Sequence, residues 1–458
     1  GVTAGILAEV RRVCQRAVTP RLVDQTMFDR YLSETYQNDS GAAMQMIEDL
    51  GDEVDLSSLA ESIPETGDLL EQEDDAPIIK LINSLLGEAV KLAASDIHIE
   101  TYETRLVVRF RVDGVLREIV SPRRALAPLL VSRIKVMSKL DIAEKRLPQD
   151  GRISIRIGGK EVDVRVSTIP ASNGERVVMR LLDKHEGMRD LSHLGMSPRD
   201  KEAMSSLVQR PHGILLVTGP TGSGKSTTLY ACLDQLNDQS RNILTVEDPI
   251  EYDIEGIGQT QVNAKADMTF AKGLRAILRQ DPDVVMVGEI RDFETADISV
   301  QASLTGHLVL STLHTNTAIG AVTRLANMGV QPYLLSNSLI GLVAQRLVRV
   351  LCTHCREAYS ADEYECGFLK AEPSDPPTIY RLAGCEACAN EGYRGRMGIY
   401  EVVSLDDDLR RMIHSGASEL DMGRHVRGRA TSIRDDGRAR VLEGLTTVDE
   451  ILRITMEE

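Results

Sequence analysis

A chain of 458 residues is too long for one hydrophobic core, and its length predicts about three domains of roughly 100 to 200 residues each. Aromatic residues make up 3% of it and Trp is absent, so the cores are expected to be aliphatic. The net charge of -16 lies mostly between Arg30 and Lys80, where 14 Asp and Glu and no Lys or Arg occur; this balance, with so few stacking residues, argues against nucleic acid as a partner.

No segment of the chain is typical of export or of a membrane span. The first residue is Gly1 rather than Met, and no basic start followed by an apolar run is present, so we expect no signal peptide and a missing natural beginning. Runs of 18 or more apolar residues do not occur. Any membrane attachment is therefore expected to go through a partner.

The first segments in chain order are a small helical unit and an acidic linker. Residues 1–60 begin with apolar positions at helical spacing and predict a helical domain. Residues 61–76 are acidic and nearly free of large apolar side chains, as in a solvated linker. A flexible joint is expected there.

Residues 77–185 predict an α+β domain. Apolar positions over 78–90 recur at helical spacing, and the alternating segment 96–99 predicts a strand. Turn signals at 113–114 and 158–159 each lie between alternating segments. Two hairpins are therefore expected after the first strand.

From about residue 186 the pattern changes to strands that alternate with helices, which is typical of a parallel sheet. An α/β core is expected over 186–349. Its strands are expected at 214–218, 243–246, 284–287 and 308–312. The tail at 391–458 is expected to be helical, because its apolar positions recur at helical spacing.

A phosphate-binding motif follows the first of these strands. Residues 219–226, GPTGSGKS, match G-x-x-x-x-G-K-[ST] between a strand and a helical segment, the context that the motif requires. Lys225 is expected to reach the β- and γ-phosphates of ATP, and the Ser226 hydroxyl to bind Mg²⁺. The candidate nucleotide ligands are Gly219, Pro220, Thr221, Gly222, Ser223, Gly224, Lys225, Ser226 and Thr227.

Hydrolysis also needs a carboxylate that orients water or holds the metal, and two strand ends supply one. Glu289 follows the strand at 284–287 and is the leading candidate for the general base. Glu251, after the strand at 243–246, is the rival base, and Asp248 is a candidate ligand of water or the metal. The sequence does not decide between Glu289 and Glu251.

Histidines and arginines near these segments are further candidates. His307 and His314 bracket the strand at 308–312, and both a γ-phosphate sensor and a structural role fit them. Five arginines are candidate arginine fingers, with surface ion pairing as the alternative for each: Arg165, Arg180, Arg275, Arg279 and Arg291.

Four of the seven cysteines form two C-x-x-C pairs separated by 29 residues: Cys352 with Cys355, and Cys385 with Cys388. This pattern predicts one tetrahedral S₄ site, and four thiolates leave no open position on the metal. Structural zinc is therefore expected to hold an insertion over 350–390, with redox-active or unliganded thiols as the alternatives.

Together these motifs resemble the secretion ATPase superfamily, and most closely its type II secretion members. Residues 245–252 resemble the family's aspartate box, 281–292 its atypical Walker B motif and 305–316 its histidine box. Segments such as 95–100 (SDIHIE) and 147–154 (LPQDGRIS) resemble its second domain. The tetracysteine insertion is typical of secretion and pilus-assembly members and is absent from retraction motors.

The resemblance implies a RecA-like ATPase core preceded by a PAS-like domain, assembled as a hexameric ring with ATP between subunits. It implies that the five arginines contribute around the phosphates. Residues 1–60 resemble part of a domain that binds the cytoplasmic part of a bitopic inner-membrane protein. Other inner-membrane platform components and acidic phospholipid are further partners that the resemblance implies.

ATP hydrolysis that powers type II secretion is the function implied by this resemblance. Type IV pilus assembly is the nearest alternative. A nucleic-acid translocase and a nucleotide-dependent scaffold are less favoured, the first because the chain is acidic and has no dense basic stripe.

Overall fold

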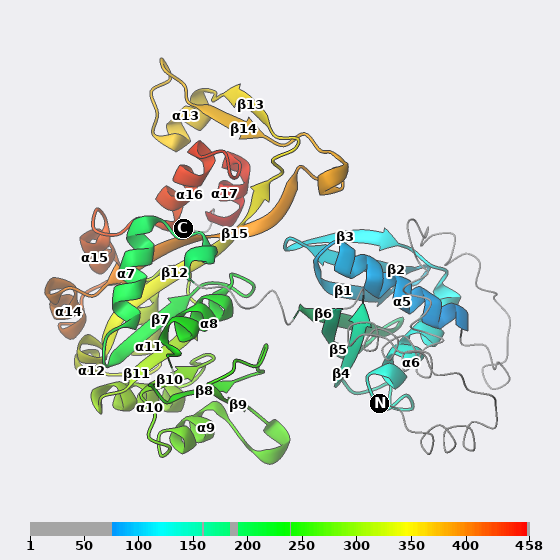
Figure 1. Ribbon diagram of the computed structural model, residues 1–458, viewed down its shortest axis with the longest axis horizontal. Helices are drawn as coiled ribbons and strands as arrows, with labels where there is room; N and C mark the ends of the chain where they lie inside the picture. The colour runs from blue at the N-terminus through cyan, green and yellow to red at the C-terminus, as the bar shows by residue number, and fades with distance from the viewer. Residues whose placement is uncertain (1–75, 158–159, 184–190, 239, 456–458) are drawn as a thin grey trace, which may run out of the picture. The chain divides into compact units, whose positions relative to one another are not determined.

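The computed structural model describes residues 76–157, 160–183, 191–238 and 240–455 (Figure 1). The helical unit predicted at 1–60 lies outside these residues, as does the predicted linker except for its last residue. Contacts divide the chain into two compact units, with the main division between Leu181 and Leu182. None of the helices that the structure describes is both long enough and apolar enough to cross a bilayer.

The first unit is a six-stranded sheet of order β3-β2-β1-β6-β5-β4, with helices α5 and α6 packed on one face. Its elements are α5 (Ala76–Lys91), β1 (Ala94–Thr101), β2 (Leu106–Val112), β3 (Val115–Val120), a 3-10 turn (Arg124–Leu126), α6 (Ala127–Met137), β4 (Gln149–Ile157), β5 (Lys160–Ala171) and β6 (Gly174–Asp183). The predicted helix, first strand and two hairpins are confirmed. Asp113 and Gly114, at the first turn, both have positive φ (49° and 83°), as a tight hairpin of this kind requires.

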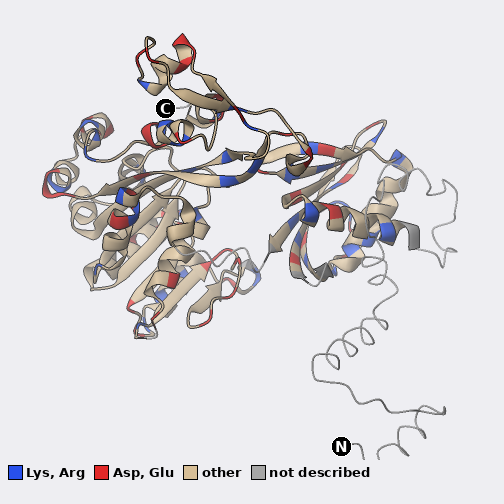
Figure 2. Cartoon of the chain, turned by 45° about the horizontal axis from the view of Figure 1, so that its top comes forward, with Lys and Arg blue, Asp and Glu red and all other residues tan. Residues whose placement is uncertain are grey.

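The other face of this sheet carries ion pairs, because charged residues alternate with core residues along the strands. Glu100 pairs with Arg109 (2.6 Å) and Arg176 (2.7 Å), and Asp96 pairs with Arg180 (2.9 Å). Both carboxylates are buried beneath the arginines. Figure 2 shows basic and acidic residues side by side on these strands. Within its own unit, Arg180 therefore has a carboxylate partner.

The second unit is built on a seven-stranded sheet of order β15-β12-β7-β11-β10-β8-β9, in which all neighbours are parallel except β12 and β15. The strands are β7 (Gly213–Thr218), β8 (Ile243–Glu247), β9 (Gly258–Gln261), β10 (Val284–Val287), β11 (Leu308–Leu313), β12 (Leu339–Leu351) and β15 (Tyr393–Ser404). The four predicted core strands are β7, β8, β10 and β11, and all four are confirmed.

Helices pack on both faces of this sheet and bury its strands from two sides. They are α7 (Pro198–Val208), α8 (Lys225–Leu236), α9 (Phe270–Ile277), α10 (Phe293–Leu304), α11 (Gly320–Asn327), α12 (Pro332–Ser338), α14 (Asp407–His414), α15 (Glu419–Val426), α16 (Ile433–Leu442) and α17 (Val448–Thr455). Three short 3-10 turns complete the unit, at Leu191–Leu194, Ala264–Ala266 and Glu386–Cys388.

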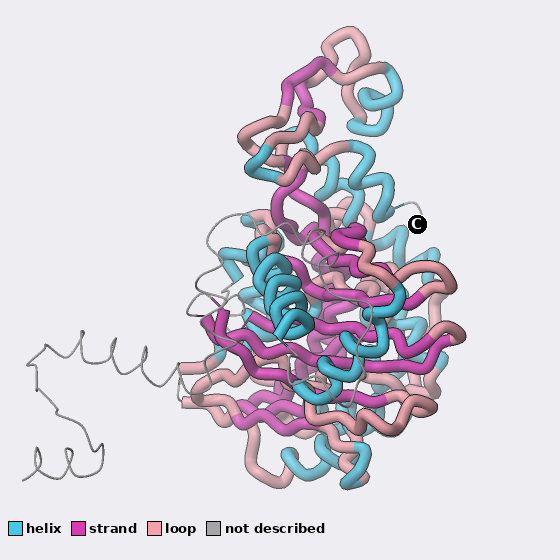
Figure 3. Tube along the Cα trace, turned by 90° about the vertical axis from the view of Figure 1, so that its right-hand side faces the viewer, coloured by secondary structure: helices cyan, strands magenta, loops and turns pink. Residues whose placement is uncertain are grey.

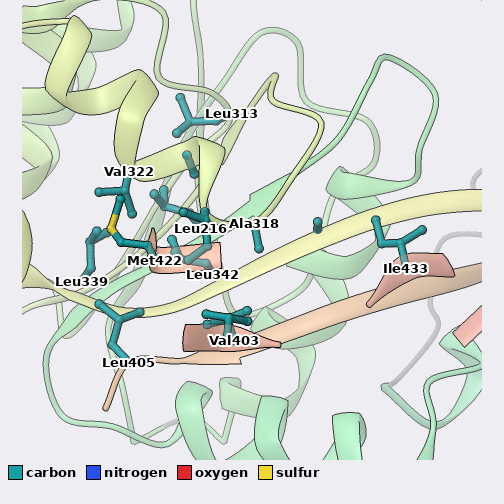
Figure 4. Packing of buried hydrophobic residues seen from close by; sticks show 14 of the residues in the cluster. Leu216, Leu313, Ala318, Val322, Leu339, Leu342, Val403, Leu405, Met422 and Ile433 are labelled. Carbon is teal, nitrogen blue, oxygen red and sulfur yellow. The ribbon is translucent and has the colours of Figure 1, made fainter. Parts of the chain in front are cut away.

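One of the two main cores gathers side chains from the sheet and from the helices on that face. Leu216, Leu342 and Val403 from three neighbouring strands meet Val322 of α11 and Met422 of α15 (Figure 4). On β7 the residues either side of Leu216 belong to the other core. The P-loop strand is therefore buried on both faces, as is usual in a parallel sheet covered by helices.

The prediction that the whole tail at 391–458 is helical was wrong for its first part. Residues 393–404 form β15, an antiparallel partner of β12, and helices begin only at α14. The strand forms because Ile399, Val402 and Val403 fit a pleated surface that β12 offers more than forty residues earlier in the chain. Such a distant pairing leaves little trace in local periodicity.

The segment between β12 and β15 forms a small layer that projects from the second unit (Figure 3) and packs against α16. It contains β13 (Glu357–Ser360), α13 (Glu363–Leu369) and β14 (Thr378–Arg381), with β13 and β14 antiparallel. Cys352 directly follows β12, and Cys388 precedes β15 by a few residues. The two cysteine pairs therefore lie where the layer joins the sheet.

Candidate active site

The loop at 219–226 connects β7 to α8 and has the backbone shape of a phosphate-binding loop. Gly219, Gly222 and Gly224 all have positive φ (154°, 79° and 85°). A Cβ atom at Gly219 would lie 2.5 Å from the carbonyl oxygen of Gln345, so only glycine fits there. Gly224 is the N-cap of α8. Because glycine has no side chain that could accept a hydrogen bond, the first backbone N–H groups of the helix are left to face an anion.

Lys225 lies inside this loop and is 9% exposed. Its Nζ donates hydrogen bonds to the carbonyl oxygens of Gly219 (2.9 Å) and Pro220 (3.0 Å). Burial, with a smaller contribution from the nearby Arg346, lowers the pKa of Lys225 to about 8. The hydroxyl of Ser223 in the same loop is buried without a hydrogen-bond partner among the residues that the structure describes. Both features fit a loop that holds the oxygens of a phosphate group.

Three strand ends bring polar side chains together beside the loop. Glu289, after β10, accepts a hydrogen bond from Nε2 of His314, after β11 (3.3 Å). Arg291 contacts the other oxygen of Glu289 and pairs with Asp248, after β8 (Nη1 to Oδ2, 3.3 Å). Hence Glu289, His314, Arg291 and Asp248 form one cluster.

His314 connects this cluster to the P-loop. Its ring also lies near the backbone of Gly219, the residue whose carbonyl Lys225 binds. Burial and the charges of Lys225 and Arg291 lower the pKa of His314, so the neutral ring is favoured at neutral pH. A neutral ring can donate one proton at one nitrogen and is suited to sensing the position of a neighbouring acceptor.

The other acids of the aspartate box have different surroundings. Glu247 is buried and accepts hydrogen bonds from Tyr230 Oη, Thr245 Oγ1 (2.5 Å) and Gln259 Nε2 (3.1 Å), so its oxygens are occupied by structural partners. The backbone N–H of Glu251 donates to the same Tyr230 Oη (3.2 Å). Glu251 is therefore anchored to α8 through its main chain, whereas Glu289 faces the histidine. The choice between the two as base stays a prediction.

The five predicted arginines are not all gathered at this cluster. Arg291 belongs to it and also lies over the ring of Phe270 (5.5 Å to the ring centre). Arg275 forms an exposed ion pair with Glu294 (2.5 Å), and Arg279 is exposed just after α9.

Arg165 and Arg180 lie in the first unit, on β5 and β6. Their roles around a nucleotide, like those of Arg275 and Arg279, stay predictions. His307 lies at the opposite end of β11 from His314, where its Nδ1 pairs with the carbonyl oxygen of Ala302 (2.9 Å). This contact is of the structural kind.

Two residues that sequence reasoning missed also touch the P-loop. Gln345 Oε1 accepts a hydrogen bond from Thr228 Oγ1 of α8 (2.7 Å), and Arg346 donates to the carbonyl oxygen of Asn316 (2.8 Å). Both lie on β12, a strand that we did not predict. The signal was present, since two adjacent polar residues interrupt the otherwise apolar run LIGLVA before the strand continues.

The four predicted cysteines converge at the base of the insertion, with all sulfur atoms within 4.8 Å of one another. Cys385 Sγ lies 3.8 Å from Cys352 Sγ and 3.7 Å from Cys388 Sγ, and Cys355 lies 3.8 Å from Cys388. A tetrahedral site with zinc–sulfur bonds of about 2.3 Å has edges of about 3.8 Å. The spacing therefore fits a tetrahedral thiolate site.

Backbone amides support charge on these sulfurs. Gly384 donates to Cys355 Sγ (3.3 Å) and Gly392 to Cys388 Sγ (3.2 Å). Although burial opposes it, hydrogen bonds from the amides of Cys385 and Gly392 lower the pKa of the Cys388 thiol to about 6, whereas burial raises the pKa of the Cys385 thiol beside it. Since a thiolate is the form that binds metal, the surroundings suit a metal site.

The sheet order, the loop with its buried lysine and the carboxylates at the strand ends define an α/β P-loop ATPase. Residues 71–453 match the family described as Type II/IV secretion system protein, and the chain belongs to this family. It is thus a member of the secretion ATPases, which hydrolyse ATP and depend on Mg²⁺ to do so.

Relatives resemble the chain over almost its whole length. It is 66% identical to the Type II secretion system protein E of Pseudomonas aeruginosa, over 100% of this chain and 91% of that protein. It is 61% identical to the Type II secretion system ATPase E of Vibrio cholerae, over 98% of this chain and 90% of that protein. The family predicted from the motifs is confirmed.

Solved structures support the fold. The pilus retraction motor PilT with bound ADP is 25% identical, covers 81% of this chain and 96% of its own, and has a TM-score of 0.55. The Legionella pneumophila ATPase DotB is 21% identical over 82% of this chain and 95% of its own, with a TM-score of 0.61. At that identity, the second likeness shows the fold alone.

Proposed function

We propose that this chain hydrolyses ATP to power type II secretion, that is, pseudopilus assembly and protein export across the outer membrane. The observation that carries the proposal is the contact between Glu289 and His314 beside a P-loop whose lysine is buried. The names of relatives at up to 66% identity over the full chain support the process that the ATPase serves. Type IV pilus assembly is the nearest alternative.

In the proposed reaction the P-loop amides and Lys225 bind the triphosphate, and Ser226 and Thr227 at the start of α8 face its β- and γ-phosphates. The Ser226 side chain is exposed and so is available as a ligand. Bound Mg²⁺ would neutralise part of the phosphate charge, with the Ser226 hydroxyl as its protein ligand and Asp248 near by. The remaining steps belong to the chain's own side chains.

Glu289 is proposed to accept the proton of the attacking water, and His314 to hold the carboxylate in position at Oε2. Arg291 contacts the same carboxylate, and an arginine that leaves it for a phosphate oxygen would both free the base and supply positive charge. The arrangement thereby couples the presence of a phosphate to the activation of Glu289.

The partners of the machine are part of the same proposal. We expect a hexameric ring in which Arg165, Arg180, Arg275 and Arg279 contribute to nucleotide sites between subunits. We expect residues 1–60 to bind the cytoplasmic domain of a bitopic inner-membrane protein, so that a cytoplasmic ATPase is attached peripherally to that membrane. Other platform proteins and acidic phospholipid are further expected contacts, and nucleic acid is not one.

Phosphate release measured with and without the cytoplasmic domain of the inner-membrane partner tests this function. We expect slow hydrolysis by the chain alone and a rate at least several-fold higher when the partner domain and acidic lipid are added. Stimulation by the corresponding domain of a pilus system instead would favour pilus assembly. No hydrolysis under any of these conditions would contradict the proposal.

Zinc at the four cysteines is a further part of the proposal. We expect about one zinc ion per chain by elemental analysis, because the sulfur spacing matches a tetrahedral site. Cys385→Ser is expected to lose the metal and to expose the insertion to proteolysis, since so small a layer has little core of its own. ATP binding at the P-loop should persist in this variant.

Cys366→Ser is the matched control, because Cys366 is a buried cysteine of α13 in the same insertion but outside the cluster. It should keep the full zinc content. Equal zinc content in wild type and Cys385→Ser would rule out the tetracysteine site.

A further inference from the structure

Strand β12 continues past the end of the P-loop strand. Its parallel pairing with β7 ends at Ala344, opposite Thr218, and the next two residues are Gln345 and Arg346. They lie beside the loop that begins at Gly219 and are 1% and 6% exposed, respectively. Two adjacent buried polar residues in a mostly apolar strand are costly unless they satisfy other polar groups.

Gln345 touches both ends of the P-loop. The main-chain carbonyl oxygen of Gln345 faces Gly219, where an added Cβ atom would lie 2.5 Å from it. The side-chain Nε2 of Gln345 faces Gly224, where an added Cβ atom would lie 2.8 Å from it. Its Oε1 accepts the hydrogen bond from Thr228 Oγ1 in the first turn of α8 (2.7 Å, fully buried). The backbone and the side chain of one residue therefore lie against both ends of the loop.

Arg346 joins this residue to the segment that follows His314. Its Nη1 donates to the carbonyl oxygen of Gln345 (3.1 Å) and its Nη2 to that of Asn316 (2.8 Å). Thr315, between His314 and Asn316, is fastened to the other side of the loop: its N–H donates to Thr218 Oγ1, and its carbonyl accepts from it (both 2.9 Å). The histidine segment is thus tied to the P-loop from two sides.

The charge of Arg346 also acts on the loop. Burying a guanidinium costs free energy, and an apolar residue would fill the same place in a strand at less cost. The guanidinium lies close enough to Lys225 to help lower the pKa of its ammonium. Two positive charges therefore lie at the buried base of an anion site. Such an arrangement favours a bound anion over the empty loop.

We propose that Gln345 and Arg346 are positioning residues for the P-loop: Gln345 sets the shape of the loop, and Arg346 holds the loop and the His314 segment in one fixed relation. The proposal rests on the proposed function, because it names residues that adjust the same ATP site. Gln345 governs the affinity for nucleotide, and Arg346 governs turnover as well as affinity.

The experiment compares variants of near-equal size in the full chain with its zinc. Gln345→Met keeps the length of the side chain and loses both polar atoms, Thr228→Val loses only the hydroxyl, and the double variant closes a cycle. Arg346→Lys keeps the charge and loses the planar fork, whereas Arg346→Met loses both. Dissociation constants for a fluorescent ATP analogue, kcat, KM and thermal unfolding are measured for each.

Arg349→Lys is the control for simple destabilisation. Arg349 lies on the same strand and donates a similar fork to the buried Glu450 (Nη2 to Oε2, 2.7 Å), in a network with Arg453 and not with the P-loop. This variant should unfold at lower temperature and bind nucleotide within about twofold of wild type, since it changes no P-loop contact.

We expect Gln345→Met to raise the dissociation constant about tenfold, and the double variant to be little worse than Gln345→Met alone, because the two side chains share one hydrogen bond. Arg346→Lys should lower kcat about tenfold with a smaller change in affinity for nucleotide. Arg346→Met should lower both kcat and this affinity. Melting temperatures should not rank the variants in the same order as these losses.

Wild-type affinity and turnover in Gln345→Met and Arg346→Lys would overturn the inference. So would losses that simply follow the melting temperature and are matched by Arg349→Lys, because both residues would then be ordinary structural groups. Affinity is measured independently of hydrolysis. A wild-type chain that binds nucleotide but does not hydrolyse it would therefore count against the proposed function, while the affinity results still judge Gln345.

Discussion

Replacement of Lys225 by alanine is expected to reduce ATP hydrolysis at least about a hundredfold, to background, in the assembled, zinc-loaded protein. The ammonium lies inside the loop and donates hydrogen bonds to the carbonyl oxygens of Gly219 and Pro220. An alanine removes the ammonium that neutralises charge developing between the β- and γ-phosphates. Release of orthophosphate under saturating ATP and Mg²⁺ measures the loss.

Lys225→Ala should lose activity but should not lose thermal stability. The pKa of Lys225 is lowered to about 8, below its ordinary value of 10.5, so below pH 8 the folded chain keeps a charge that burial disfavours. This unfavourable contribution to folding is present at pH 7 and disappears as the pH rises past the pKa of Lys225 in the unfolded chain. Lys225→Ala should therefore melt at the same temperature as wild type or higher at pH 7.

The control is Lys272→Ala, which removes an exposed lysine of α9 whose ammonium pairs with Asp267 on the surface. A surface pair of this kind contributes ~0–1 kcal/mol, so both activity and melting temperature should stay close to wild type. Hydrolysis that survives in Lys225→Ala would mean that the loop at 219–226 is not the site of reaction.

Much of this site could be predicted from the sequence because its chemistry is written in short segments. The P-loop requires glycines at fixed offsets from Lys225, and a strand on one side and a helix on the other are visible as local patterns. The carboxyl ends of parallel strands meet at one edge of a sheet, so Asp248, Glu289 and His314 could be expected to converge. The structure brings these three together through Arg291.

What could not be predicted depends on contacts between distant segments. Strand β12 pairs with β7 and β15, and neither pairing has a local signature, so Gln345 and Arg346 were not recognised as neighbours of the loop. The different surroundings of Glu247 and Asp248 also depend on contacts between distant segments. The carboxylate of Glu247 is occupied in part by Tyr230, seventeen residues earlier on α8, and by Gln259, twelve residues later.

Charge alone was also too weak a signal to sort the arginines. Arg275 and Arg291 flank the same strand in the sequence, yet Arg275 pairs with Glu294 at the surface while Arg291 faces Glu289. The spacing of a sequence gives no direction for a long flexible side chain. The ion pairs with Glu289 and Asp248 show that Arg291 is the one turned toward the strand-end carboxylates, and its guanidinium also lies over the ring of Phe270.

Replacement of Glu289 by glutamine is expected to lower kcat by about a hundredfold to ten-thousandfold and to leave ATP binding intact or tighter. Glutamine keeps the size of the side chain and an oxygen for the His314 hydrogen bond, but it cannot take a proton from water. Loss of the carboxylate also removes negative charge from the phosphate site and frees Arg291 from its partner. Single-turnover phosphate release and analogue binding, measured side by side, separate chemistry from affinity.

Glu251→Gln supplies the comparison that decides between the two candidate bases. The structure fastens Glu251 through its main-chain N–H to Tyr230, a contact that glutamine retains, so its substitution should change kcat by less than about tenfold. The opposite ranking, with hydrolysis kept in Glu289→Gln and lost in Glu251→Gln, would move the proton transfer to the end of β8. In that case the pair formed by Glu289 and His314 would serve to sense the γ-phosphate, and Arg291 would act by releasing that sensor rather than the base.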